Sequence, residues 1–345
     1  MNRSFIVPIH LLRCAFLLLL GLLPQLAAAS GPMRIVVAMP GPDAAPYLPL
    51  QLISRINADR EAGFILSTRY FGGGPLAVKD MVDQNSDFAG LGMPALAGIR
   101  LSNPNLVSIA ALAQAPAYVL MARQDLKNRI RTLADLRWRS IGTHSGGKQG
   151  KSTARQIAEY LLMRNGVGIN DVNFVHAGQN LADYSAALQS GQVDAIVVNE
   201  PAATLLEKHK LAWRLADLHD PAVAKKHLGG RFLYTQLATT TETLRDQPDK
   251  VRLLNTALRE TLRWMATHSA REIVAYLQLS DEEEKLALEK FLAAHKGIYS
   301  PDGAFSEEAV HNSEAFFHAV SGDDPAAAQL RYADFIDSRW SGRSR

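Results

Sequence analysis

The feature that most constrains the fold of this chain is a regular alternation of short apolar stretches with amphipathic ones. Residues 34–38, 65–71, 87–92 and 106–112 have the composition of short strands. Between them, residues 48–60 and 76–82 have the spacing of helices, and Pro94 begins another. Alternation at this spacing predicts an α/β sheet whose parallel strands are joined by crossover helices.

A second unit of the same kind begins after residue 116. Its predicted strands cover 117–122, 140–142, 172–176 and 194–198, and its predicted helices cover 152–164 and 181–189. A strand over 233–240 would return to the first unit, and helices would fill 248–268, 270–277, 281–295 and 306–320. Because no linker rich in Pro, Gly or Ser divides the chain, the two lobes must share crossing segments. We predict lobe one over 30–120 plus 235–345, and lobe two over 121–234.

Residues 1–29 have the layout of a secretory signal peptide. Arg3 gives a basic start, a leucine-rich run follows, and three alanines at 27–29 offer a small-residue cleavage site. A membrane anchor is the alternative, but the strongly apolar stretch 15–23 is shorter than the ~20 residues that a spanning helix needs. We predict cleavage near Ala29, export to the periplasm, and no stable membrane insertion afterwards.

The composition argues against several classes of function. Cys14 is the only cysteine and lies inside the predicted signal peptide, so the mature chain would have neither disulfides nor thiolate chemistry. The formal net charge of +3 falls to about +1 without Arg3 and Arg13, which gives the chain as a whole no electrostatic reason to bind nucleic acid or an anionic membrane. The ten histidines include no H-E-x-x-H spacing, and no G-x-S-x-G is present. We expect no metal, no cofactor and no catalytic residue.

Several short motifs occur in a characteristic order. They are residues 71–75 (FGGGP), 87–92 (DFAGLG), 132–136 (TLADL), 189–195 (QSGQVDA) and 199–201 (NEP). With these motifs the chain resembles the soluble substrate-binding subunits of ABC importers of the nitrate/sulfonate/taurine class, the SsuA/NMT1-like family. Trp138 and Arg139 depart from that pattern, since the family usually has a glycine in this region.

The resemblance implies the type II fold of periplasmic binding proteins. Two lobes, each a mixed and mainly parallel sheet flanked by helices, would be joined by two crossover segments. A small polar or anionic molecule such as a sulfonate, nitrate or taurine would bind in the cleft between them. The partners would be a membrane permease and its ATPase, and the protein would act as a monomer without chemistry of its own. Two alternatives stay open: an exported enzyme of the same fold, and a ligand-sensing module for a membrane receptor.

In such folds the ligand lies beyond the carboxyl ends of the strands. The loops of lobe one and the first crossover then offer Asp43, Tyr47, Gly73, Gly74, Pro94 and Gln114. The loops of lobe two and the second crossover offer His144, Ser145, Lys151, Ser152, His176, Asn199, Glu200 and Tyr234. Free backbone amides at the glycine-rich turn would suit an anion, although the turn is also typical of an ordinary strand-to-helix connection.

Three of these features have competing interpretations. Residues 150–152 (GKS) invite comparison with a phosphate-binding loop, but that motif needs glycine where Ser145 stands. Ser152 either contacts ligand or caps the next helix, and both can hold. Glu200 follows a very apolar strand, so it either meets a donor on the ligand, or caps the next helix or pairs with a basic group of lobe two. The four tryptophans, Trp138, Trp213, Trp264 and Trp340, are expected to pack under surface segments.

Overall fold

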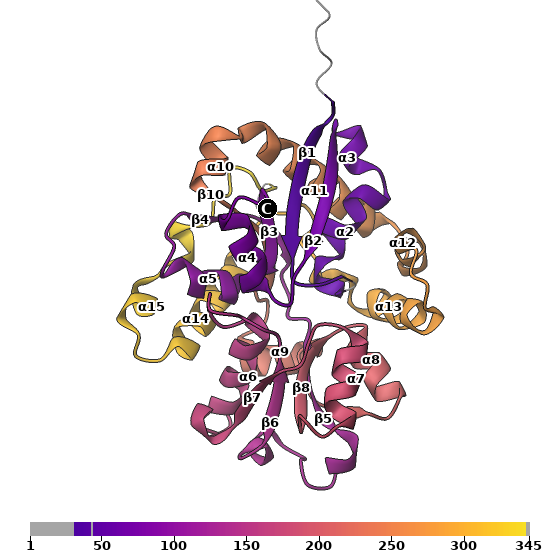
Figure 1. Cartoon of the computed structure of the whole chain (residues 1–345), viewed down its shortest axis with the longest axis vertical. Helices are drawn as coiled ribbons and strands as arrows, with labels where there is room; N and C mark the ends of the chain where they lie inside the picture. The colour runs from indigo at the N-terminus through magenta and orange to yellow at the C-terminus, as the bar shows by residue number, and fades with distance from the viewer. Residues whose placement is uncertain (1–30, 43, 343–345) are drawn as a thin grey trace, which may run out of the picture. The chain divides into compact units, whose positions relative to one another are not determined.

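Two five-stranded sheets organise the chain (Figure 1). The computed structural model describes residues 31–42 and 44–342, so the predicted signal peptide and Asp43 lie outside the described residues. Both sheets belong to one compact unit, Arg34–Arg345. Among the described helices, none is long and apolar enough to cross a membrane.

The first sheet has the strand order β2-β1-β3-β10-β4. Its strands are β1 (Met33–Met39), β2 (Phe64–Tyr70), β3 (Phe88–Gly92), β4 (Leu106–Ala113) and β10 (Thr235–Thr240). Strands β1 and β3 run parallel, whereas β10 runs antiparallel to both β3 and β4. The last part of the chain lies along the β4 edge, where Ser108 bridges to Ile336 and Ala113 bridges to Tyr299.

The second sheet has the strand order β7-β6-β8-β5-β9. Its strands are β5 (Tyr118–Arg123), β6 (Ser140–Thr143), β7 (Asn173–His176), β8 (Ala195–Asn199) and β9 (Ala212–Asp217). Strand β6 runs parallel to β7 and β8, and β5 runs antiparallel to β8 and β9. Strand β9 is not predicted from the sequence, because this edge strand is mostly half-buried and mixes apolar with charged residues.

Two segments join the sheets. The chain leaves the first sheet after β4 and enters the second at β5, and it returns between α9 (Pro221–Leu228) and β10. These connections confirm the predicted fold of two lobes with mixed sheets and two crossovers. The residue limits of the lobes stay a prediction. The name lobe one denotes the part that contains the first sheet, and lobe two the part that contains the second.

Helices flank both sheets. In lobe one they include α2 (Leu48–Arg55), α3 (Ala58–Glu61), α4 (Gly74–Val82), α5 (Met93–Arg100), α10 (Thr241–Asp246), α11 (Pro248–Thr267), α12 (Ala270–Leu277), α13 (Glu282–His295), α14 (Glu307–Ser321) and α15 (Pro325–Gln329). In lobe two they include α6 (Thr153–Met163), α7 (Leu181–Gln189) and α8 (Ala202–Lys208) besides α9. The single helix predicted over 48–60 is wrong: Asn57 takes a left-handed φ of 64°, which separates α2 from α3.

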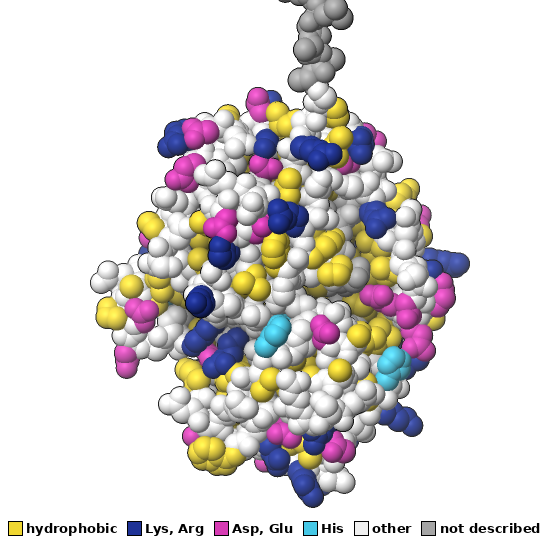
Figure 2. Space-filling view, in the orientation of Figure 1, with side chains coloured by type: hydrophobic (Ala, Val, Ile, Leu, Met, Phe, Trp, Pro, Cys, Tyr) yellow, Lys and Arg dark blue, Asp and Glu magenta, His cyan; other side chains and the backbone are white. Residues whose placement is uncertain are grey.

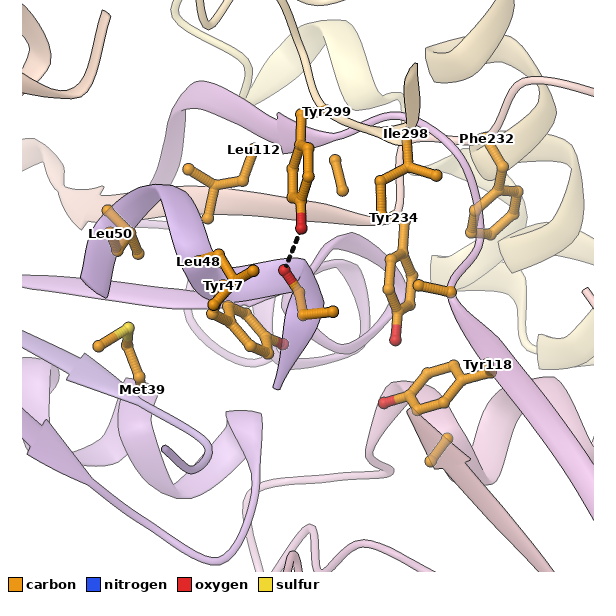
Figure 3. Packing of buried hydrophobic residues seen from close by; sticks show 14 of the residues in the cluster. Met39, Tyr47, Leu48, Leu50, Leu112, Tyr118, Phe232, Tyr234, Ile298 and Tyr299 are labelled. Carbon is orange, nitrogen blue, oxygen red and sulfur yellow. Dashed lines mark hydrogen bonds between the residues drawn. The ribbon is translucent and has the colours of Figure 1, made fainter. Parts of the chain in front are cut away.

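One hydrophobic cluster includes residues of both lobes and of both crossovers (Figure 3). The hydroxyl of Tyr299 donates a hydrogen bond of 2.7 Å to the carbonyl of Ala45, which joins segments far apart in the sequence. Tyr118 and Tyr234, one from each crossover, meet edge to face with ring centroids 5.1 Å apart. The crossovers are therefore packed into buried aromatic structure.

The tryptophans differ in their packing. Trp213 and Trp340 are partly buried against the core, and Trp264 stacks on His268 with ring centroids 4.2 Å apart. Trp138 contradicts the expectation, because 74% of its surface is exposed.

Candidate functional site

A cavity of about 490 Å³ lies where the carboxyl ends of strands from both lobes meet. It touches the ends of β1, β3, β6 and β8 at Pro40, Gly92, His144 and Asn199 respectively. Parallel strands have their carboxyl ends at the same end of the sheet, and the loops that follow these ends enclose the binding crevice. The sheet topology of both lobes thus converges on one candidate site.

Six of the fourteen predicted site residues line this cavity. Those in its lining are Tyr47, Gly74, His144, Ser152, Asn199 and Glu200. Others lie directly beside the lining. Gly73 approaches the backbone of Ser145, the carbonyl of Pro94 accepts a hydrogen bond of 3.0 Å from Gln156, and the hydroxyl of Tyr234 donates one of 2.7 Å to Asn199.

Three predicted residues lie elsewhere. The side-chain amide of Gln114 donates to the carbonyl of Ala304 and accepts from the backbone of Ser306, in a separate pocket. Lys151 is used in an ion pair of 2.8 Å with the buried Glu159. His176 is exposed at the end of β7. Together with Asp43, which the structure does not describe, these residues contribute nothing to the described lining of the cavity.

Two glycines of lobe one allow the lobes to touch. A Cβ atom on Gly73 would lie 1.8 Å from the carbonyl oxygen of Ser145, and one on Gly92 would lie 2.0 Å from the hydroxyl of Thr153. Backbone also meets backbone across the cavity, since the amide of Ala45 donates a hydrogen bond of 3.1 Å to the carbonyl of Glu200. The structure is therefore a closed arrangement of the lobes, and any side chain at Gly73 would hold them apart.

An uncharged cluster of aromatic residues forms one wall. The hydroxyl of Tyr118 lies 3.4 Å from Nδ1 of His144, and that of Tyr184 lies 3.0 Å from Nε2. The hydroxyls of Tyr47, Tyr118 and Tyr234 point toward one region (Figure 3). Burial lowers the pKa of His144 to about 3, with a smaller effect from His176, and burial raises the pKa of Tyr118 to about 12. At neutral pH, His144 and its two tyrosine partners are uncharged.

Both carboxylate oxygens of Glu200 accept hydrogen bonds from groups within lobe two. One carboxylate oxygen accepts a hydrogen bond of 2.6 Å from Arg214, and the other accepts one of 2.9 Å from the backbone amide of Thr204 in α8. Burial lowers the pKa of Arg214, but the charge and hydrogen bond of Glu200, with help from Asp217 and Glu207, outweigh burial and leave it raised. Of the two interpretations of Glu200, the structure has the second: Glu200 both holds the first turn of α8 and pairs with a basic group.

Two polar groups at the cavity have no hydrogen-bond partner among the described residues. They are the hydroxyl of Thr153, a residue only 4% exposed, and the side-chain amide nitrogen of Gln179. Both stand beside helix starts. Ser152 caps α6 by accepting from Arg155, and Asn180 caps α7 by accepting from Asp183. A buried polar group without a partner is costly, so both groups are suited to a bound molecule.

The rim of the cavity is acidic and spans both lobes. His209, Asp281 and Glu284 line it. Helix α13 packs against α8 here, and Glu283 accepts hydrogen bonds of 2.9 Å from Lys208 and 2.7 Å from His209. These bonds, from His209 first and then Lys208, lower the pKa of the Glu283 carboxyl.

Sequence reasoning missed several lining residues, chiefly Tyr184, His209, Asp281 and Glu284. Asp281 carries a local signal, since an aspartate before three glutamates is typical of a helix start, and it does cap α13. That signal indicates a helix but not its neighbour. Within the described part of the chain, no group of three or more His, Cys, Asp or Glu side chains is placed to hold a metal ion.

Solved structures with the same fold include several binding proteins. A protein from Bordetella bronchiseptica has a TM-score of 0.78 at 21% identity, over 89% of this chain and 95% of that one. The alkanesulfonate-binding protein SsuA from Xanthomonas axonopodis pv. citri, bound to MOPS, has a TM-score of 0.69 at 17% identity, over 90% and 100%. The nitrate-binding protein NrtA from Synechocystis has a TM-score of 0.66 at 12% identity, over 89% and 87%. These likenesses establish the periplasmic-binding-protein fold.

The fold is not confined to carriers. DszB, an enzyme solved in complex with biphenyl-2-sulfinic acid, has a TM-score of 0.56 at 14% identity, over 89% of this chain and 98% of that one. No curated protein matches this sequence. The family model described as NMT1/THI5 like matches residues 70–271, which is more than half of the chain. By this match the chain belongs to the NMT1/THI5-like family.

Proposed function

We propose that this chain is the solute-binding component of an ABC import system. It would be exported to the periplasm, capture a small polar or anionic solute between its lobes, and deliver it as a monomer to a membrane permease driven by an ATPase. The observation that carries the proposal is the hydroxyl of Thr153, which is buried at the closed cavity without a partner. The match to binding proteins of sulfonates and nitrate supports the same class of cargo.

The donors at the cavity suit one negative charge at most. The described lining contains neither Lys nor Arg. An anionic group would instead meet the hydroxyl of Thr153, the amide of Gln179 and the first turns of α6 and α7. A helix start carries roughly half a positive charge, so two of them offset a single anionic group.

The acidic rim restricts the charge that the other end of the solute can carry. Asp281 and Glu284 would repel a second anionic group at the mouth of the cavity. A monoanion with a neutral or amino tail therefore fits better than a dicarboxylate. This is the pattern of a sulfonate or of taurine, and nitrate fits as an anion without a tail.

The lining favours binding over catalysis. The hydroxyl of Ser152 donates a hydrogen bond of 2.9 Å to the backbone carbonyl of His144 and caps α6, so no base activates it. His144 itself has a pKa of about 3, far below the range in which a histidine serves as a base near neutral pH.

A thermal-shift panel on ligand-free protein tests the proposal. The panel contains alkanesulfonates, taurine and nitrate, with dicarboxylates of similar size as the matched control. A solute at 100 times its dissociation constant stabilises a fold by about 2.7 kcal/mol, which a melting curve resolves. We expect a monoanion to raise the melting temperature and the dicarboxylates to leave it unchanged. Equal shifts with dicarboxylates, or turnover of the bound compound, would contradict the proposal.

A further inference from the structure

Trp138 occupies a position that its side chain does not explain. Its backbone φ is 64°, in the left-handed region that favours glycine, and 74% of its surface is exposed. A bulky residue in this conformation is strained, and glycine would avoid that strain. The ring therefore gains little from packing and is held where it contacts solvent.

The backbone around Trp138 is firmly fixed. Its amide donates a hydrogen bond of 2.6 Å to the carbonyl of Asp171. The neighbouring guanidinium of Arg137 bonds the carboxylate of Asp171 at 2.7 Å and the carbonyl of Gly166 at 2.6 Å. Strain that is held in place this way points to a use outside the fold.

Basic side chains surround this position in the sequence. Residues 127–139 (KNRIRTLADLRWR) contain five basic residues and one acidic residue. The acidic residue, Asp135, is used locally, because its carboxylate accepts from the backbone amides of Arg131 and Thr132. Asp135 stays ionised and Asp171 pairs with Arg137, so these two carboxylates offset two of the five positive charges. The segment keeps a net positive charge in a chain that is nearly neutral as a whole. We call Trp138 together with Lys127, Arg129, Arg131, Arg137 and Arg139 the Trp138 surface.

The Trp138 surface lies at the end of the second sheet that is opposite the cavity. Its segment connects the end of β5 to the start of β6, whereas the other end of β6 leads to His144 in the cavity lining. Figure 1 shows this connection at the lower end of lobe two. In Figure 2, Lys and Arg side chains lie at that lower end, with Asp and Glu side chains between them. A partner bound here would leave the cavity accessible.

We propose that the Trp138 surface docks on a membrane surface that carries anionic phospholipid headgroups. Tryptophan prefers the membrane–water interface, where its amphipathic ring lies at headgroup level. Lysine and arginine side chains near an anionic bilayer add attraction that salt weakens. A protein partner would instead need a pocket or an apolar patch around the ring, whereas the segment that carries Trp138 contains five basic residues. The proposal does not depend on what the cavity binds.

Vesicle sedimentation tests this inference. The chain from Ser30 to Arg345, which contains the whole compact unit, is mixed at low salt with vesicles of phosphatidylglycerol or of phosphatidylcholine. We expect binding to phosphatidylglycerol at least about tenfold stronger than to phosphatidylcholine, and loss of most of it in high salt. The joint variant Arg129→Gln and Arg131→Gln should weaken binding about tenfold.

The tryptophan itself is tested with a variant that the backbone favours. Trp138→Gly suits the positive φ, so it should keep or raise the melting temperature while it abolishes vesicle binding. Leu286→Ala is the control, because Leu286 is 62% exposed but lies on α13. Unchanged vesicle binding by Trp138→Gly would overturn the proposal. So would binding that requires a membrane protein in the vesicles.

Discussion

The two walls of the cavity are built differently. Lobe one contributes mainly residues without polar side chains, among them Pro40, Pro42, Ala44, Gly74 and Gly92. Lobe two contributes mainly hydrogen-bonding side chains, among them His144, Thr153, Gln179, Asn180 and Asn199. One wall therefore supplies shape and close backbone approach, and the other supplies recognition. We expect a solute to bind lobe two first and lobe one to close over it.

The largest expected effect comes from removing the close approach of lobe one. Gly73→Ala places a Cβ atom against the carbonyl of Ser145, and backbone cannot move aside easily. If the closed form becomes rare, the apparent dissociation constant should rise about a hundredfold. Calorimetry measures the affinity, and solution scattering measures the opening.

The neighbouring glycine provides the control for this variant. A Cβ atom on Gly72 would meet Leu76 at 3.9 Å, an ordinary contact, so Gly72→Ala should bind normally. Equal affinity of both variants would show that the close approach at Gly73 does not limit closure of the lobes.

The next effect tests recognition by lobe two. Thr153→Val keeps the shape of the side chain and removes the unpartnered hydroxyl, so affinity for the solute should fall about tenfold, the worth of one good hydrogen bond. Thr261→Val is the matched control, since Thr261 is also buried but bonds within α11. If the affinity of Thr153→Val were unchanged, the hydroxyl of Thr153 would not contribute to recognition of the solute.

A third prediction concerns the uncharged state of the lobe-two wall. The pKa of His144 is lowered from 6.5 to about 3, so the unfolded chain takes up a proton that the folded chain refuses. The contribution of His144 to the free energy of unfolding should have its largest value above pH 6.5 and should fall as the pH drops toward 3. His144→Gln should reduce that slope by about 1.4 kcal/mol per pH unit.

Urea unfolding at several pH values in that range measures the slope. The exposed His311 offers a control, and His311→Gln should leave the slope unchanged. The same slope in wild type and in His144→Gln would mean that His144 is not buried as a neutral group.

The smallest effect is expected at the rim, where both lobes contribute charge. Glu283→Gln removes an exposed pairing with Lys208 and His209, and exposed ion pairs contribute little to stability. Solute affinity should fall about two- to threefold, and the difference should vanish in high salt. Glu282→Gln, whose carboxylate pairs with Lys285 inside α13, should not alter affinity.

Local sequence patterns predicted the framework well because its signals are local. Helices α7 and α12 agree at both ends with the predicted 181–189 and 270–277, since apolar spacing and capping residues define them. The strands that line the cavity are apolar runs bounded by turns. From such strands the edge that holds the site follows, and six predicted residues do line the cavity.

The role of Glu200 shows where this reasoning stops. Its partner Arg214 lies on β9, a strand that is not predicted from the sequence. The sequence alone therefore could not decide between a ligand contact and an ion pair for Glu200. The rim has the same cause: Asp281 and Glu284 reach the cavity only because α13 packs on α8 far away in the chain. Pairings between distant segments leave no mark in a single sequence.

The position of β10 has a consequence for the order in which the chain can fold as it is synthesised. All strands of the second sheet lie within residues 118–217, whereas β10, which sits between β3 and β4, begins at Thr235. The β4 edge is covered later still, by Tyr299 and Ile336. A chain made from its N-terminus therefore carries β1 to β4 as an incomplete sheet with an unprotected edge until nearly its last residues exist. The lobe that is begun first is the lobe that is finished last.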